Sequence, residues 1–223
     1  NVQGLIYYFC FMINIIICGT GGFARELYCW IKYSEIHQNI IFKGFLDRND
    51  SSLVPFGLER YYLGHEDTYT AEDKDFLLIA IADVNTRDLL YRKLKNKNYN
   101  FFNYIHESVI IGEDVKFGEG NIVCPNSVLT TNININNCNI FNINCTVGHD
   151  VTIGSFNTFN SHCDITGYSK IISNNFFGSR VTLLPKSKIG SNNKIAAGSV
   201  VYKGIKNNCI YLGNPAIKIS SNV

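Results

Sequence analysis

The stretch that decides the fold is residues 145–165, CTVGHDVTIGSFNTFNSHCDI, in which every sixth residue from Val147 is large and apolar. The same spacing continues in both directions without a slip. Sixteen aliphatic or phenylalanine residues occupy it: Ile111, Phe117, Val123, Leu129, Ile135, Phe141, Val147, Ile153, Phe159, Ile165, Ile171, Phe177, Leu183, Ile189, Ile195 and Val201. A fixed short period is typical of solenoid proteins, and three hexads make one triangular coil. The C-terminal half is therefore predicted to be a parallel β-helix of about five coils.

The position two residues before each large residue is mostly small or short, and glycine often follows the large one. A large side chain can then fill a narrow interior beside a small one, while Gly or Asn supplies the turn. Cys145 and Cys163 fall in the small position. We therefore expect them to pack inside the β-helix rather than to act as nucleophiles.

Composition and charge argue against several classes of protein. The chain has 223 residues and a formal net charge of +2, which gives no reason to expect a nucleic acid or a membrane as partner. The eight cysteines form no CxxC pair and do not cluster with the five histidines, so we expect reduced thiols, a cytoplasmic location and no metal site. The apolar run at residues 5–18 is too short to span a bilayer and has no basic flank. Residues 1–11 are predicted to be an extension outside the fold, which would begin at Met12.

Residues 12–105 alternate between strand and helix. We expect four strands, at residues 13–18, 40–46, 76–82 and 99–105, and two helices, at residues 23–33 and from an N-cap at Asp83 through Leu94. Strands that alternate with helices predict a small parallel sheet with helices on its faces, a Rossmann-like α/β domain. Residues 106–223 are then a second, all-β domain.

Glycines follow the first expected strand. Gly19, Gly21 and Ala24 fit the pattern G-x-G-x-x-A, and Gly22 adds a third glycine to the loop. Such a loop can hold a phosphate at the start of the helix, although it can equally be a tight turn. Asp47 ends the second strand, where a dinucleotide-binding fold places the acid that binds ribose. A nicotinamide-dependent oxidoreductase is therefore an alternative for this half, but the small sheet favours a nucleotide sugar.

Six short motifs together resemble the hexapeptide-repeat sugar acetyltransferases. They are GTGGFARE at 19–26, FLD at 45–47, IH at 105–106, VGHD at 147–150, IAAGSVV at 195–201 and GNPA at 213–216. The subfamily includes the sialic acid O-acetyltransferase and the N-acetyltransferases of nucleotide-linked 4-amino-4,6-dideoxy sugars. The resemblance covers residues 12–219. It implies a left-handed β-helix, acetyl-CoA as donor, and a homotrimer whose active sites lie between neighbouring β-helices.

The resemblance also implies roles for single residues. His149 matches the general base, and Asp150 is placed to orient its ring and stabilise the imidazolium. Gly167 matches the position whose backbone N–H binds the oxyanion. Many relatives carry a second histidine near the thioester, nine residues after the base, and this chain departs from them with Thr158. Either the hydroxyl of Thr158 makes that contact, or the enzyme works without it.

The remaining expected contacts concern the two substrates. CoA is expected along the groove between subunits, near Ala197 and the turn that contains Pro215. The UDP part of the acceptor is expected near Asp47, with the pyrophosphate near Gly19, Gly21 and Gly22.

The leading hypothesis from the sequence is acetyl-CoA-dependent N-acetylation of a nucleotide-linked 4-amino-4,6-dideoxyhexose, UDP-linked in the first instance, with dTDP as the other carrier considered. One alternative is O-acetylation of sialic acid or another sugar hydroxyl with the same base. Another is a non-catalytic β-helix that serves as a scaffold or binding module, although the adjacent His149 and Asp150 argue against this alternative.

Overall fold

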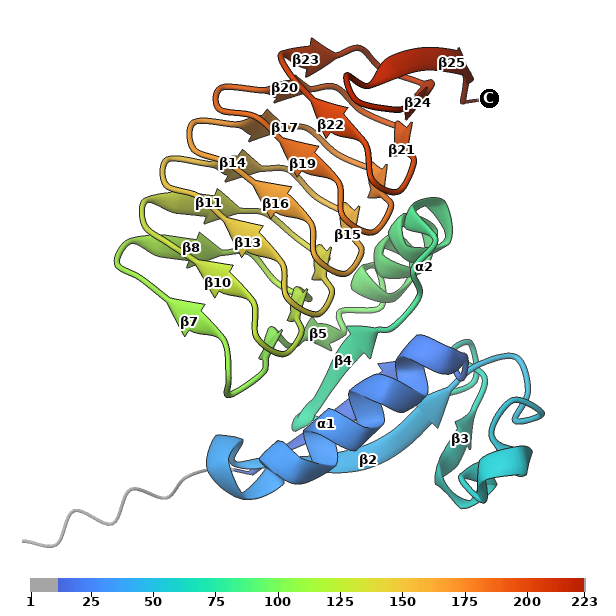
Figure 1. Ribbon diagram of the computed structural model, residues 1–223. Coiled ribbons are helices and arrows are strands. Elements are labelled where there is room, and N and C mark those ends of the chain that lie inside the picture. The colour runs from blue at the N-terminus through green and yellow to red at the C-terminus, as the bar shows by residue number, and fades with distance from the viewer. Residues whose placement is uncertain (1–11, 223) are drawn as a thin grey trace, which may run out of the picture.

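The computed structural model describes residues 12–222, and for residues 34–38 it describes the backbone alone. The extension predicted for residues 1–11 lies outside the described residues. The chain has two parts: an α/β part, blue to green in Figure 1, and a β-helix, green to red. Neither helix in the described part of the chain is long and apolar enough to cross a membrane.

The α/β part is a five-stranded parallel sheet in the order β3-β2-β1-β4-β5. Its strands are β1 (Ile13–Cys18), β2 (Ile40–Leu46), β3 (Tyr62–Gly64), β4 (Asp75–Ile79) and β5 (Asn100–Phe101). Its helices are α1 (Gly22–Gln38) and α2 (Val84–Lys95), with two 3-10 turns, η1 (Val54–Phe56) and η2 (Glu59–Tyr61). The predicted cap of α2 is confirmed, because the Thr86 amide donates to Asp83 Oδ1 at 2.8 Å.

The β-helix is built from three sheets, and most of its strands pair in parallel with the strand one coil later. The first sheet contains β7 (Ile110–Ile111), β10 (Val128–Leu129), β13 (Thr146–Val147), β16 (Asp164–Ile165), β19 (Thr182–Leu183) and β22 (Val200–Val201). The second contains β8 (Val115–Phe117), β11 (Ile133–Ile135), β14 (Thr152–Ile153), β17 (Lys170–Ile171), β20 (Lys188–Ile189) and β23 (Gly204–Ile205). The third contains β6 (Tyr104–Ile105), β9 (Ile122–Val123), β12 (Ile140–Phe141), β15 (Thr158–Phe159), β18 (Phe176–Phe177), β21 (Lys194–Ile195), β24 (Cys209–Leu212) and the antiparallel β25 (Ile217–Ser221).

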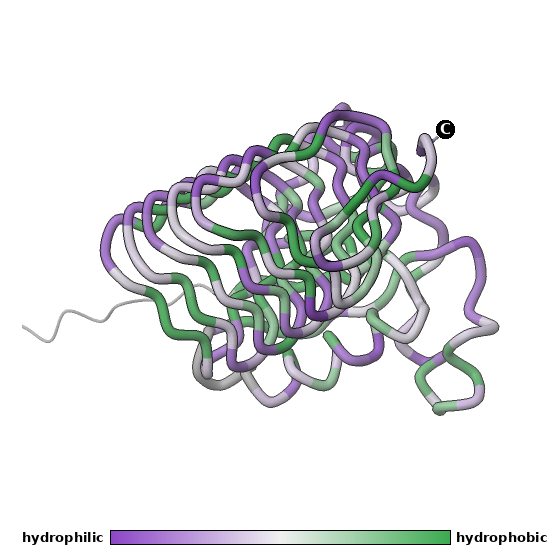
Figure 2. The backbone as a smooth tube through the Cα atoms, turned by 45° about the horizontal axis from the view of Figure 1, so that its top comes forward, coloured by the Kyte–Doolittle hydropathy of each residue, from purple (hydrophilic) through white to green (hydrophobic). Residues whose placement is uncertain are grey.

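The interior of the β-helix follows the six-residue period. Fourteen of the sixteen large apolar positions are buried, and the two exceptions, Ile111 and Phe117, lie in the first coil. In Figure 2 the hydrophobic segments recur from coil to coil. Three phenylalanine rings, Phe141, Phe159 and Phe177, stack in register with centroids 4.9 and 4.6 Å apart. Cys145 and Cys163 are buried as predicted.

One corner of the β-helix is held by a ladder of asparagines, which are buried from Asn121 onward. In each rung, the backbone amide and the side-chain amide both donate to the carboxamide oxygen of the asparagine one coil earlier. The ladder runs through Asn103, Asn121, Asn139, Asn157, Asn175 and Asn193. Buried polar groups are stable only when they are paired, and here each rung pairs the next.

We expect Asn157→Ala to lower the free energy of unfolding by about 2–3 kcal/mol, because several buried groups lose their partners at once. Asn157 Oδ1 accepts from the amide and the side chain of Asn175, and Asn157 Nδ2 donates to the Ile172 carbonyl at 2.9 Å. Denaturant unfolding measures the change. The matched control is Asn134→Ala, at an exposed position of β11. Equal stability of the two variants would contradict the role given to the ladder.

Three expected elements need correction. The single strand predicted for residues 99–105 is wrong: β5 pairs with β4 in the α/β sheet, whereas β6 pairs with β9 in the third sheet of the β-helix. The strand predicted for residues 76–82 ends at Ile79, and the helix predicted for residues 23–33 extends to Gln38. The change of sheet within six residues carries the chain directly from one part of the molecule to the other.

Candidate functional site

The first candidate site is a turn of the β-helix that carries His149 and Asp150. The turn connects β13 to β14, so it lies at the corner between the first and second sheets. Asp150 has a φ of +59°, which places its carboxylate beside the preceding residue, and its amide donates to the Thr131 carbonyl at 3.1 Å. His149 Nδ1 lies 2.7 Å from Asp150 Oδ2. This contact favours the tautomer with the proton on Nδ1, which leaves Nε2 with a lone pair.

The imidazole of His149 lies directly against Gly167, one coil further on. A Cβ atom at residue 167 would stand 2.8 Å from both Cε1 and Nε2 of His149, so any other residue there would push the imidazole away from this position. On another side the ring meets Tyr168 edge-on, with centroids 5.0 Å apart and an interplanar angle of 89°. His149 keeps 53% of its side chain exposed. The imidazole is therefore held from two sides yet remains open to solvent.

Gly167 also offers a hydrogen-bond donor. Its carbonyl accepts from the Lys186 amide at 2.9 Å, but its own N–H has no partner within residues 12–222. Nε2 of His149 likewise has no hydrogen-bond partner in the described part of the chain. A free donor and a free acceptor therefore lie side by side, as the addition of a nucleophile to a thioester carbonyl requires.

Thr158 lies in a different place. It is 2% exposed, and its hydroxyl accepts from Arg87 Nη2 at 2.8 Å and donates to the Ala82 carbonyl at 2.9 Å. β15, which carries it, belongs to the third sheet, whereas the turn with His149 joins the first two. The hydroxyl that was expected near the thioester is thus occupied in joining the two parts of the chain, because Arg87 and Ala82 come from the α/β part. With its proton donated to the Ala82 carbonyl, the Thr158 hydroxyl has none left for a contact with the thioester of CoA.

Ala197 and Pro215 lie together near the end of the β-helix. Both residues are exposed, and the chain segments that hold them are joined through Val200, whose amide donates to the Gly213 carbonyl and whose carbonyl accepts from the Ala216 amide. With strands about 4.8 Å apart, Ala197 is about 13 Å from His149 along the axis of the β-helix. Only an elongated ligand would reach from His149 to these residues.

The second candidate site is the glycine loop between β1 and α1. Gly19 has a φ of +114°, and a Cβ there would stand 3.1 Å from the Ala80 carbonyl oxygen, so the loop passes close to the end of β4. Gly21 caps α1 without any side-chain hydrogen bond, and the space beside it is open. The first amides of α1 are therefore available to an anion, together with the positive end of the helix dipole.

Asp47 holds this loop in shape. Its Oδ2 accepts from the amide of Thr20 at 2.9 Å and from the Thr20 hydroxyl at 2.7 Å, and its Oδ1 accepts from the Arg48 amide at 2.7 Å. Thr20 was not singled out from the sequence, and it is 3% exposed. Asp47 therefore acts on the conformation of the glycine loop as well as lying at its edge.

A cavity of about 600 Å³ adjoins the loop at the carboxyl ends of β1, β2 and β4. It is lined by Gly19, Leu46, Asp47, Arg48, Glu66, Ile81, Thr86, Leu89, Leu90 and Lys93. In the order β3-β2-β1-β4-β5 the chain leaves β1 towards β2 and returns on the other side of β1 as β4, so the cavity lies at the switch point of the sheet. Open α/β sheets bind ligands at this place.

The two candidate sites are separate within one chain. The α/β part contacts the third sheet, through Arg87 and Thr158, while His149 stands at the opposite corner, between the first and second sheets. Figure 1 shows α2 beside the third sheet, near β15. A molecule bound at the glycine loop and the His149 of the same chain therefore lie on different sides of the β-helix.

Among the described residues, His65, Glu66 and Asp67 form one group with ligand atoms close enough to share a metal ion. However, Lys93 Nζ already lies 3.1 Å from Glu66 Oε1 and 2.6 Å from Asp67 Oδ1. The ammonium group takes the place that a cation would occupy. His65, Glu66 and Asp67 therefore form an ion-pair network with Lys93 at the edge of the cavity.

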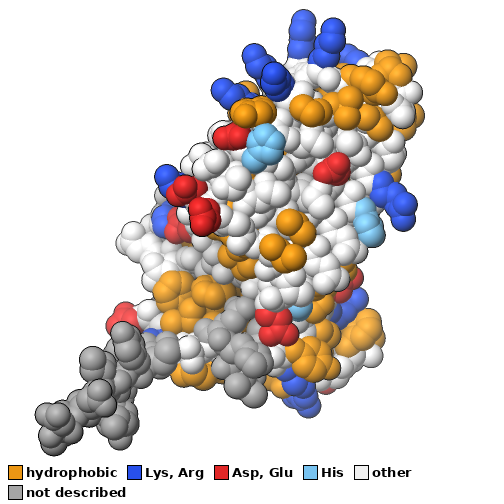
Figure 3. Space-filling model, turned by 60° about the vertical axis from the view of Figure 1, so that its left-hand side comes forward, with side chains coloured by type: hydrophobic (Ala, Val, Ile, Leu, Met, Phe, Trp, Pro, Cys, Tyr) orange, Lys and Arg blue, Asp and Glu red, His pale blue; other side chains and the backbone are white. Residues whose placement is uncertain are grey.

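The end of the β-helix is strongly basic. Residues 181–223 contain six lysines and no Asp or Glu, and Figure 3 shows Lys and Arg side chains gathered at the end of the molecule far from the grey N-terminal residues. Lys170 and Lys188 stand opposite each other on β17 and β20. Like charges on adjacent strands repel unless an anion lies between them. The six lysines without an acidic residue are visible in the sequence and are the signal that could have indicated this basic end.

No family model and no curated protein matches the sequence. Solved structures do match its fold. PerB from Caulobacter crescentus, in complex with CoA and GDP-perosamine, has a TM-score of 0.82 at 22% identity and covers 93% of this chain and 97% of its own. The acetyltransferase domain of PglB from Neisseria gonorrhoeae FA1090, in complex with acetyl coenzyme A, has a TM-score of 0.82 at 18% identity, with 92% and 98% covered. WeeI from Acinetobacter baumannii AYE has a TM-score of 0.80 at 23% identity, with 93% and 100% covered. The chain therefore has the fold of these proteins, an α/β part followed by a left-handed parallel β-helix.

Proposed function

We propose that this chain is an acetyl-CoA-dependent N-acetyltransferase that acts on the 4-amino group of a nucleotide-linked 4-amino-4,6-dideoxyhexose. One observation carries the proposal: the imidazole of His149, held by Asp150, exposes a free Nε2 beside the unpaired N–H of Gly167. Support comes from the fold it shares with PerB, which was crystallised with CoA and GDP-perosamine, and with the PglB domain, which was crystallised with acetyl coenzyme A.

In the proposed reaction the sugar amine attacks the thioester carbonyl, and Nε2 of His149 takes the proton that the nitrogen loses. Asp150 accepts the hydrogen bond from Nδ1 and stabilises the imidazolium while it exists. The N–H of Gly167 donates to the oxyanion of the tetrahedral intermediate. Collapse breaks the C–S bond, and the proton passes from His149 to the sulfur of the departing CoA.

The basic end of the β-helix supports CoA as the donor carrier. CoA carries several phosphate charges at one end and its thioester at the other. With the thioester at His149, the phosphates would lie toward the later coils, where Lys170 and Lys188 line a cavity of about 480 Å³. The exposed Ala197 and Pro215 remain proposed contacts on these coils.

The cavity at the glycine loop is the proposed nucleotide site. The sheet has five strands and one switch point, which suits one mononucleotide unit rather than the two halves of a dinucleotide fold. The pyrophosphate would lie at the start of α1, near Gly21 and Gly22, and UDP is the carrier we propose first. The alternative of a nicotinamide-dependent oxidoreductase is not supported by this topology.

We expect Asp47→Asn to weaken the binding of the nucleotide about tenfold while leaving kcat at saturating substrate close to that of the wild type. The amide cannot accept on both sides, so Thr20 or Arg48 loses a charge-assisted hydrogen bond and the glycine loop loosens. Calorimetric titration with UDP, dTDP and GDP measures the change and also identifies the carrier. Asp50→Asn is the control, because Asp50 does not line the cavity. Unchanged affinity for the nucleotide in Asp47→Asn would show that the glycine loop is not part of the nucleotide site.

A homotrimer is the proposed assembly. Because the nucleotide site and His149 are separate within one chain, a complete active site needs a second copy, and three copies around an axis close the arrangement. Light scattering after size-exclusion chromatography measures the mass. A monomer that is fully active would contradict both the trimer and the shared site.

The function itself is tested by thiol release from acetyl-CoA with UDP-, dTDP- and GDP-linked 4-amino-4,6-dideoxyhexoses. Release that depends on the amino sugar, with an alkali-stable N-acetyl product, is the expected result. An alkali-labile ester formed on a sugar hydroxyl would instead favour O-acetylation. No release with any sugar would favour a scaffold or binding module.

A further inference from the structure

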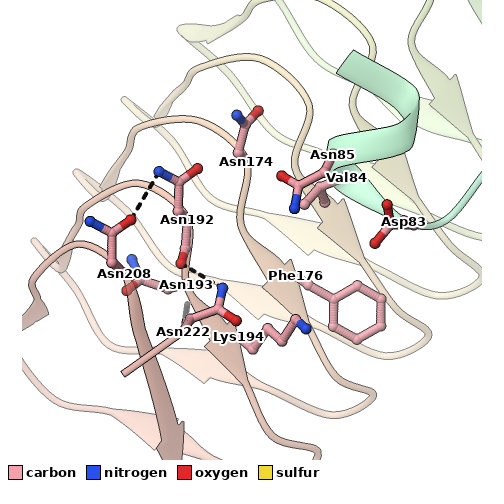
Figure 4. Close-up of a pocket in the computed structure, with 10 residues that line it drawn as sticks. All are labelled: Asp83, Val84, Asn85, Asn174, Phe176, Asn192, Asn193, Lys194, Asn208 and Asn222. Carbon is pink, nitrogen blue, oxygen red and sulfur yellow. Dashed lines mark hydrogen bonds between the residues drawn. The ribbon is translucent and has the colours of Figure 1, made fainter. Parts of the chain in front are cut away.

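A second polar groove lies between the start of α2 and the third sheet of the β-helix (Figure 4). Its volume is about 640 Å³, slightly larger than that of the cavity at the glycine loop. The lining residues are Asp83, Val84, Asn85, Asn174, Phe176, Asn192, Asn193, Lys194, Asn208 and Asn222. No role assigned so far uses this groove.

The groove is lined mainly by carboxamides. Some of them fix one another, since Asn192 Nδ2 donates to Asn208 Oδ1 at 3.0 Å and Asn222 Nδ2 donates to the Asn192 carbonyl at 2.8 Å. Asn174 Oδ1 is different, because it is buried and has no hydrogen-bond partner among the described residues. A buried acceptor without a partner is costly, and a turn of the Asn174 carboxamide toward the groove would relieve this cost by bringing the oxygen to a donor there.

Two further side chains complete the lining. Figure 4 shows Phe176 and Lys194 extending from β18 and β21 into the space in front of α2. Phe176 lies next to Thr158 and Lys194 along the outer face of the third sheet, and it is only partly buried. Its ring therefore offers an apolar surface among amides.

The charges on the groove do not favour a phosphate-rich ligand. The formal charges of Asp83 and Lys194 sum to zero, and one oxygen of Asp83 already accepts from the amide and the hydroxyl of Thr86. A ligand that suits several amides and one aromatic face is a neutral ring with neighbouring hydroxyl groups and an apolar C–H face. A carboxamide presents a donor and an acceptor side by side, as two adjacent hydroxyls require.

We infer that this groove binds a pyranose ring, with Phe176 against the C–H face and Asn174, turned toward the groove, accepting from a hydroxyl or amino group. The inference deepens the proposed function, on which it rests: the ring would be the sugar of the nucleotide-linked substrate. Residues 83–85 line the groove, whereas Ile81, Thr86 and Leu89 line the nucleotide cavity, so the two spaces adjoin the same first turn of α2. A sugar joined to a diphosphate in one could occupy the other.

The test compares Phe176→Leu with the wild type, using three probes in calorimetric titrations: UDP, the UDP-linked 4-amino-4,6-dideoxyhexose, and the methyl glycoside of the same amino sugar. We expect the affinity for the nucleotide sugar to fall about tenfold, with UDP binding and the KM for acetyl-CoA unchanged. Tyr202→Leu, at an exposed position of the β-helix, is the matched control and should bind all three probes as the wild type does.

The outcomes separate the groove from the proposed function. Equal losses for UDP and for the nucleotide sugar, or a change confined to the KM for acetyl-CoA, would overturn the pyranose site even in an active enzyme. If no nucleotide sugar is acetylated, binding of the methyl glycoside that is lost in Phe176→Leu would still support the groove and would identify an unlinked sugar as its ligand. If the wild type binds neither the nucleotide sugar nor the methyl glycoside, the proposed pyranose site is rejected.

Discussion

His149→Asn should lower kcat by about 10²–10⁴-fold, which is the usual contribution of a general base. The carboxamide cannot take up the proton that the amine loses on attacking the thioester. The ring also rests on Gly167 and meets Tyr168 edge-on, so the variant leaves the oxyanion donor in place but removes the acceptor next to it. Thiol release under saturating substrate measures the loss.

Although it loses activity, His149→Asn should fold and bind its substrates as the wild type does. His149 is half exposed and contributes no side chain to the interior, so the melting temperature, the mass in solution and the affinities for CoA and nucleotide should stay close to those of the wild type. His162→Asn is the matched control, because His162 is an exposed residue of the turn between β15 and β16. Activity of His149→Asn near that of His162→Asn would eliminate the proposed mechanism.

The architecture of the β-helix could be predicted because the place of each residue in the six-residue repeat follows from its neighbours in the sequence. Each coil repeats the same three strands and turns, so the large residue at every sixth position points inward wherever the repeat is intact. The burial of Phe159 and Cys163 follows from their places in the hexad, without knowledge of any distant contact. The same regularity placed His149 in a turn, which is why its exposure could be expected.

Features that depend on distant partners could not be predicted in this way. Nothing local in residues 99–105 shows that β5 joins β4 while β6 joins β9, because the two partners come from different parts of the chain. Thr158 is outward-facing by its place in the hexad, and only the approach of α2 buries it. The hydrogen bonds from Thr20 to Asp47 likewise join two loops 27 residues apart.

Arg87 determines how the two parts of the chain fit together. It is 1% exposed, and its guanidinium faces four acceptors and no carboxylate: the carbonyls of Cys138, Ile81 and Ala82 and the hydroxyl of Thr158. Burial lowers the pKa of Arg87 to about 10, which still leaves the group protonated near neutral pH. Two of its partners belong to the β-helix, and the other two, Ile81 and Ala82, lie in the loop between β4 and α2, where Ile81 also lines the cavity at the glycine loop. One side chain therefore joins the wall of this cavity to the β-helix.

Arg87→Met should lower the free energy of unfolding by about 3–5 kcal/mol, because it removes one partner and leaves the buried acceptors unsatisfied. A methionine fills similar space, so the loss reports the hydrogen bonds rather than a cavity. Arg92→Met is the matched control on the same helix: Arg92 is exposed and pairs only with Asp88, so we expect a loss below about 1 kcal/mol. If the guanidinium also fixes the angle between the two parts, Arg87→Met should raise the KM for the nucleotide sugar more than it changes the affinity for the nucleotide alone. The reason is that the proposed nucleotide site lies in the α/β part alone, whereas in the proposed trimer the sugar must reach His149 of another copy. Equal stability of the two variants in denaturant unfolding would show that the junction is held by its apolar contacts instead.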